Sequence, residues 1–95
     1  MQSQTEHLIE LLDRVLEEAQ LRIQAPNSDA HYWPKLETLI AWVNEKRSEA
    51  TSGTLFPSKG EYTLGLARSV LDWDSQFSEL TKAAGAADRF YRDNF

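Results

Sequence analysis

The sequence predicts an all-α protein, a bundle of three long helices with a short C-terminal helix or tail. Apolar residues recur at three- and four-residue spacings along most of the chain, and no stretch shows the alternation typical of a half-buried strand. Four glycines and three prolines leave few interruptions. Since 95 residues is the length of one ordinary domain with its own core, we expect a single domain over residues 1–95.

The first helix is expected over about residues 4–25. Ser3 and Glu6 match a capping box, in which the serine hydroxyl accepts from an amide of the first turn. The segment 25–28, Ala-Pro-Asn-Ser, ends the helix. Its apolar stripe consists of Leu8, Leu11, Leu12, Val15, Leu16, Ala19 and Ile23. This spacing is typical of an amphipathic helix with one face toward a core.

The second helix is expected over about residues 32–50. Pro34 is tolerated only in a first turn, where its missing N–H would have no partner in any case. Trp33 and Trp42 flank the inward face. That face consists of Leu36, Leu39, Ile40 and Val43.

The third helix is expected over about residues 59–84, after a loop that carries Leu55 and Phe56. Ser58 and Glu61 again match a capping box. Apolar residues then recur at the a and d positions of a heptad repeat, an a/d pattern formed by Leu66, Val70, Trp73, Phe77, Leu80 and Ala84. A break at residues 72–74 stays open, Gly85 is expected just past the helix end, and residues 86–95 are expected to form the short helix or tail.

The sequence lacks the residues that several kinds of functional site require. The chain has no cysteine, which excludes disulfides and thiolate ligands, and its four glycines match no phosphate-binding loop. His7 and Glu10 share a helix face but lack the second motif that a di-metal bundle site needs. His31 has no assignable catalytic partner. We therefore expect no enzyme activity, no metal and no cofactor.

The charge of the chain narrows the possible partners. Formal net charge is −5, and residues 1–24 hold five acidic residues against two arginines. Such a surface disfavours nucleic acid and anionic membranes and would favour a basic partner if any, but a solvated helix face that keeps the protein soluble is the simpler explanation. No run of residues is apolar enough to cross a membrane, and no signal peptide is evident. A cytoplasmic protein is expected.

Aromatic residues are numerous for so short a chain, and one thin core cannot hold them all. Trp and Tyr are favoured at the centres of protein interfaces. We expect a partner or subunit interface formed by Tyr32, Trp33, Trp42, Leu55 and Phe56. For Leu55 and Phe56 the alternative is structural: the pair anchors the loop on the bundle, with Phe56 buried by its own chain.

One stretch loosely resembles the immunity proteins of nuclease colicins, which are small acidic helical bundles that inhibit a toxin. The likeness covers residues 36–73 and is carried by Ser52-Gly53, Leu55-Phe56-Pro57 and the segment from Leu66 to Trp73. The chain departs from that family in having Leu-Phe where the family has a tyrosine pair, in its longer first helix and in its longer tail. The resemblance implies a toxin inhibitor as an alternative function.

The expected function is that of a non-enzymatic protein-interaction module, a small acidic adaptor or inhibitor. The a/d seam of residues 59–84 favours self-association as a homodimer. A transcription-linked role through another regulator is compatible with the same features. A helical bundle that binds a small ligand or acts as an enzyme is the alternative from a different class.

Overall fold

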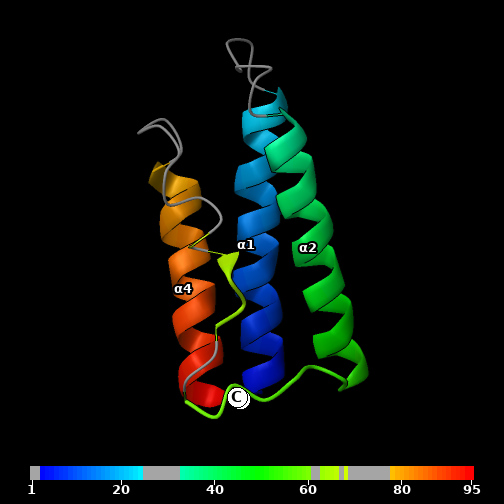
Figure 1. Ribbon diagram of the computed structural model, residues 1–95, viewed down its shortest axis with the longest axis vertical. Helices are drawn as coiled ribbons and strands as arrows, with labels where there is room; N and C mark the ends of the chain where they lie inside the picture. Colours follow the sequence, from blue (N-terminus) through cyan, green and yellow to red (C-terminus); the bar gives the residue numbers. More distant parts are fainter. Residues whose placement is uncertain (1–2, 25–32, 61–62, 67, 69–77) are drawn as a thin grey trace.

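The computed structural model describes residues 3–24, 33–60, 63–66, 68 and 78–95. Three helices lie side by side along the long axis of the molecule: α1 (Gln4–Gln24), α2 (Trp33–Ser52) and α4 (Ser78–Asn94) (Figure 1). No strand occurs within the described residues. The all-α fold expected from the sequence is confirmed, as are the first two helices, since α1 and α2 end within two residues of their expected bounds.

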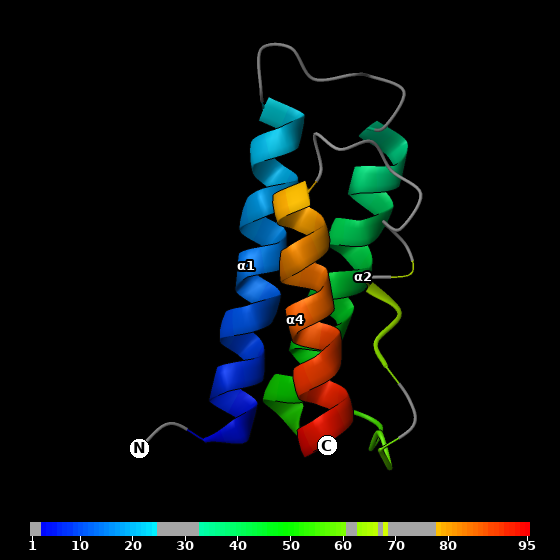
Figure 2. The same ribbon diagram turned by 90° about the vertical axis from the view of Figure 1, so that its left-hand side faces the viewer.

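Helix α1 begins where the capping pattern predicts. The Ser3 hydroxyl accepts a hydrogen bond from the backbone N–H of Glu6 at 3.1 Å, which satisfies one of the amides that a helix start leaves without an intrahelical partner. The helix then packs against both α2 and α4, so it is the central element of the bundle (Figures 1 and 2). Its fully buried apolar residues are Leu8, Leu12, Val15 and Ala19.

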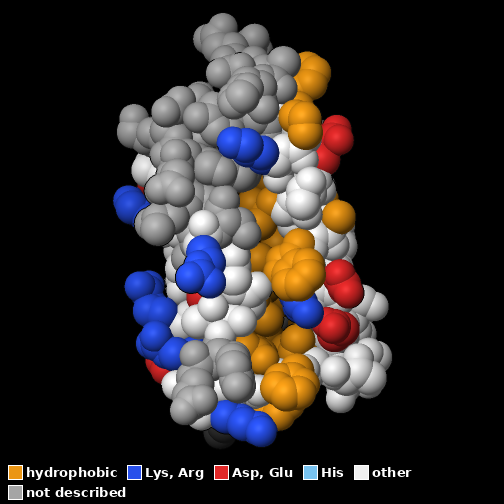
Figure 3. All heavy atoms as spheres, in the orientation of Figure 1, with side chains coloured by type: hydrophobic (Ala, Val, Ile, Leu, Met, Phe, Trp, Pro, Cys, Tyr) orange, Lys and Arg blue, Asp and Glu red, His pale blue; other side chains and the backbone are white. Residues whose placement is uncertain are grey.

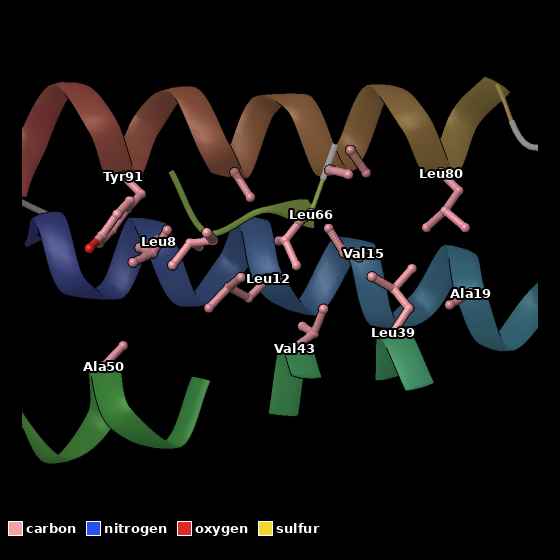
Figure 4. Packing of buried hydrophobic residues seen from close by; sticks show 14 of the residues in the cluster. Leu8, Leu12, Val15, Ala19, Leu39, Val43, Ala50, Leu66, Leu80 and Tyr91 are labelled. Atoms are coloured by element: carbon pink, nitrogen blue, oxygen red, sulfur yellow. The ribbon is translucent and has the colours of Figure 1, made fainter. Parts of the chain in front are cut away.

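Helix α2 lies against α1 through Leu36, Leu39 and Val43, which are buried as expected. Figure 4 shows Leu39 and Val43 beside α1, and Ala50 further along α2 at the end of the core that also holds Leu8. An exposed ion pair joins the two helices outside the core, with Arg47 Nε 2.7 Å from Asp13 Oδ1. Because exposed pairs contribute about 0–1 kcal/mol, the apolar contacts and not this pair hold α2 in place.

The expectation of one helix over residues 59–84 is wrong. Lys59 and Gly60 form a turn with φ of 55° and 75°, and residues 63–65 are not helical, with φ of 78° at Gly65. These positive φ values lie in the left-handed region, where a right-handed helix cannot continue. Helical conformation appears at Leu66 and Arg68, and the possible break at residues 72–74 lies outside the described residues.

Three residues of the a/d pattern can be placed in the structure. Leu66 precedes residues 69–77, which are not described, whereas Leu80 and Ala84 belong to α4, and all three side chains are fully buried in the core of their own chain. These three residues of the expected dimer seam are therefore part of the monomer's interior.

The C-terminal segment is also longer and more regular than expected. Helix α4 continues through Gly85 to Asn94, so Gly85 is not a helix end and residues 86–95 are not a separate short helix or tail. A glycine inside a helix costs about 1 kcal/mol relative to alanine, which packing can offset. The buried residues of α4 supply that packing: Leu80, Ala83, Ala84, Ala87, Asp88 and Tyr91.

An extended segment lies beside α2 and α4, on the side of the molecule away from α1 (Figures 1 and 2). We call this segment, residues 53–60 and 63–66, the strap. Leu64 and Leu66 are buried, and Leu66 lies between α4 and α1 (Figure 4). The strap thus closes part of the core that three helices alone would leave open. In the described part of the chain, no helix has the length and apolar character needed to cross a membrane.

Candidate functional site

Trp42 is an exposed aromatic residue whose position is nonetheless fixed. The ring side chain is 42% exposed on the edge of α2 that faces the strap. Its indole Nε1–H donates a 2.9 Å hydrogen bond to the backbone carbonyl of Leu64, a strap residue that packs into the core. The ammonium group of Lys46, one turn along α2, lies 4.5 Å from the centroid of the Trp42 ring. One edge of the indole is therefore tied to the protein while the ring stays open to solvent.

Phe56 is the second exposed aromatic residue of this surface. Its side chain is 64% exposed, whereas its backbone carbonyl accepts a hydrogen bond from the hydroxyl of Tyr91 on α4. Tyr91 is itself buried and stacks on Phe95, with ring centroids 5.9 Å apart. The Lys59 ammonium lies 6.0 Å from the Phe56 ring centroid. A buried residue thus anchors the backbone directly beneath an exposed ring.

Two polar groups attach the rest of the strap to α4. The fully buried hydroxyl of Ser58 donates to the backbone carbonyl of Arg92 at 2.7 Å and accepts from the Gly60 N–H at 3.2 Å. The buried carboxylate of Asp88 accepts from the backbone N–H of Leu66 at 3.3 Å. The Gly60 and Leu66 amides of the strap, which have no ladder partner, are satisfied in this way, and so is a carbonyl in the last turn of α4. Helices α2 and α4 therefore hold the strap through its backbone.

The environment of Tyr91 changes its acid–base behaviour. Burial raises the pKa of the Tyr91 hydroxyl above its ordinary value of 10.0, and the negative charge of Glu49 raises it further. The hydroxyl consequently stays protonated, and able to donate to Phe56, at every pH at which tyrosine is ordinarily neutral.

We define the aromatic surface as Trp42, Lys46, Leu55, Phe56 and Lys59. Figure 3 shows hydrophobic side chains in a column down the face that carries the strap and the edge of α2. Lys and Arg side chains lie beside this column, and acidic side chains lie mainly along its α2 edge. The surface combines exposed rings with cations and offers contact area, not reactive groups.

Three of the five expected interface residues lie on the strap or against it. Trp42 contacts the strap at Leu64, and Leu55 and Phe56 are themselves strap residues, whereas Tyr32 lies outside the described residues. Trp33 is also exposed, but it precedes Trp42 by nine residues, or two and a half helical turns, which places it on the opposite side of α2. Trp33 therefore does not join the same surface.

Leu55 and Phe56 differ in how far their own chain buries them. Leu55 is half-buried and packs against the core, as an anchor would. Phe56 is not buried by its own chain, so the expectation that it anchors the loop by burial is wrong. Its carbonyl, and not its ring, makes the contact with α4.

Sequence reasoning missed Ser58, Asp88 and Tyr91 as the groups that hold the strap. Ser58 matched a capping pattern and was assigned to a helix start. A usable signal was present: Asp88 lies four residues from Ala84 and three from Tyr91, on one face of a helix with apolar neighbours. An acid at such a position requires a hydrogen-bond donor.

Only one of the two histidines, His7, lies in the described part of the chain. His7 packs on Phe90, with ring centroids 4.5 Å apart, and His31 lies outside the described part. Within the described residues no group of three His, Cys, Asp or Glu side chains is placed to hold a metal ion.

Comparison of this chain with protein-family models, with curated proteins and with solved structures finds no match in any of the three.

Proposed function

We propose that this protein is a protein-binding module that docks its partner on the aromatic surface. One observation carries the proposal: Trp42 and Phe56 expose their rings while hydrogen bonds to neighbouring elements fix them in place. Trp residues with large contact areas dominate binding energy at many interfaces. Because the backbone at both residues is already ordered, partner binding would not carry the entropic cost of ordering it.

The adaptor and the inhibitor are two forms of this function. A toxin inhibitor, which the resemblance to immunity proteins implies, would use the same kind of surface to cover the active site of an enzyme. Self-association remains a prediction, although three residues of the seam that favoured it, Leu66, Leu80 and Ala84, are buried in their own chain.

The test compares surface variants in affinity capture. Trp42→Ser combined with Phe56→Ser removes both rings, and Leu21→Ser removes an apolar side chain that is 52% exposed on α1, away from the strap. All three proteins are first shown by circular dichroism to be equally helical. We expect wild type and Leu21→Ser to retain the same partner from a lysate of the source cells, and the double variant to lose at least nine-tenths of it. Equal retention by all three, or retention of no protein by the wild type, contradicts the proposal.

A further inference from the structure

We infer that residues 53–60 form a flap that opens separately from the rest of the strap, and that the partner binds only while the flap is closed. This inference rests on the proposed function and concerns the regulation of the same surface. Two parts of the strap carry it because they are attached in different ways. Hydrogen bonds attach residues 53–60 to α4, whereas buried leucines hold residues 63–66 in the core.

The flap is bounded by two glycines with positive φ, 76° at Gly53 and 75° at Gly60. Glycine adopts such conformations at little cost, and hinges are loop positions that absorb changes of φ and ψ. Between the two glycines, Leu55 is half-buried, Ser58 is fully buried and the other side chains are exposed. Because burial of apolar surface is the main term that resists local opening, this segment has a low free energy of opening.

Two hydrogen bonds to the last turn of α4 hold the flap closed. The Tyr91 hydroxyl donates to the Phe56 carbonyl, and the Ser58 hydroxyl donates to the Arg92 carbonyl at 2.7 Å. Tyr91 is buried, so it acts on a partner through the position of Phe56 and not by direct contact. Tyr91 is therefore a positioning residue for the aromatic surface.

Residues 63–66 are attached more firmly. Leu64 and Leu66 are buried, and Figure 4 shows Leu66 between α4 and α1. The Leu64 carbonyl accepts from the indole of Trp42, and the Leu66 N–H donates to Asp88. Withdrawing two leucines from a core costs several times as much as breaking one hydrogen bond. This part of the strap therefore opens only when the core does.

The two rings of the aromatic surface depend on different parts of the strap. Trp42 is bonded to the part that stays in place, whereas Phe56 lies on the flap. Opening thus moves Phe56 while Trp42 keeps its position. A partner that needs both rings binds the closed form, and its apparent affinity falls with the fraction of molecules whose flap is open.

The experiment exploits the absence of cysteine, since a single introduced thiol then reports on one position. Ser58→Cys and Leu66→Cys place thiols at fully buried positions, one in the flap and one in the other part of the strap. Labelling by a soluble aromatic disulfide is measured on the full chain at low urea concentrations. Ser58→Cys should label roughly tenfold faster than Leu66→Cys. Its rate should change little with urea, because local opening exposes little surface, whereas labelling of Leu66→Cys should follow global unfolding.

A second substitution tests the role of Tyr91. Tyr91→Phe keeps the ring and removes the hydroxyl that bonds the flap. It should speed labelling of Ser58→Cys roughly three- to tenfold, the effect of one lost hydrogen bond on an opening equilibrium, and leave that of Leu66→Cys unchanged. A residue that only supported the fold would speed both. Thr38→Val removes an exposed hydroxyl that donates to a backbone carbonyl near the start of α2, and this matched control should change neither rate.

Partner binding is tested in the complex that the Ser58→Cys chain captures from the lysate. Because the partner binds the closed flap, labelling in the complex should be roughly fivefold slower than in the free chain, or slower still. Equal rates in the complex and the free chain overturn the inference.

The outcomes separate this inference from the proposed function. Labelling of Ser58→Cys that is as slow and as urea-dependent as that of Leu66→Cys overturns the separate flap. The proposed function then still stands if the double variant of Trp42 and Phe56 loses the partner. Retention of the partner by that double variant overturns the proposed function, and the inference falls with it.

Discussion

Two glycines provide a direct test of the fold, because alanine substitution should have opposite effects at them. Gly65 lies in the strap with φ of 78°, whereas Gly85 lies inside α4. A Cβ added at either position meets no atom within 4 Å, so neither substitution creates a clash. The effect on stability therefore comes from the backbone conformation alone.

The magnitudes follow from conformational preference. An alanine held in the left-handed region costs roughly 1–2 kcal/mol. The lower conformational entropy of the unfolded alanine chain offsets part of this cost, so Gly65→Ala should destabilise the folded protein by about 1 kcal/mol. Gly85→Ala should stabilise by about 0.5–1 kcal/mol, since alanine is the better helix residue. At about 4–8 °C per kcal/mol for a chain of this size, the two Tm values should differ by roughly 10 °C.

The assay is urea and thermal unfolding followed by circular dichroism at 222 nm. If residues 59–84 formed one helix that ended at Gly85, the signs would be exchanged: Gly65→Ala would stabilise a helix interior, and Gly85→Ala would destabilise a left-handed helix end. A stabilised Gly65→Ala protein together with a destabilised Gly85→Ala protein therefore refutes the strap and the continuous α4.

Three further predictions concern the strap and its contacts. Ser58→Ala removes a buried hydroxyl with two hydrogen bonds and should lower the free energy of unfolding, measured with urea, by about 1–3 kcal/mol. Ser48→Ala, on the exposed face of α2, is the control and should change it by no more than about 0.5 kcal/mol. Equal effects of the two substitutions would contradict the anchoring role of Ser58. Leu66→Ala should lower the free energy of unfolding by about 2–5 kcal/mol because the side chain is fully buried. If the loss were as small as that caused by Leu21→Ala, at an exposed position, the strap would not enter the core. Burial raises the pKa of Tyr91 above 10.0 in the folded chain, so the folded state keeps its proton after the unfolded chain has ionised. Stability is unaffected by this group below about pH 10 and falls as the pH rises from there toward the folded-state pKa; Tyr91→Phe should flatten that decline, and an identical alkaline profile for both proteins would argue against it.

Helices α1 and α2 could be predicted because each buries one continuous stripe of its own. Leu8, Leu12 and Val15 recur at helical spacing and lie against the core, and a serine caps the start of α1, so local pattern and tertiary packing agree. Such agreement is what allows a single sequence to indicate a helix without knowledge of its neighbours.

The strap and the aromatic surface could not be predicted in the same way. Leu66 was interpreted as part of a helical repeat because periodicity records only that a residue is buried, not which element buries it. Trp42 stays exposed because its indole meets the Leu64 carbonyl, a contact between residues 22 positions apart. The exposure of Phe56 depends likewise on Tyr91, 35 residues further along the chain.

Hydroxyl-radical footprinting of the captured complex tests the proposed binding surface most directly. Trp42, Phe56 and Leu21 all expose oxidisable side chains in the free protein, and Leu21 lies on a different helix from the surface. Partner binding should lower the oxidation rates of Trp42 and Phe56 severalfold and leave that of Leu21 unchanged. Protection of Leu21, with Trp42 and Phe56 oxidised as fast as in the free chain, would contradict a partner that docks on the aromatic surface.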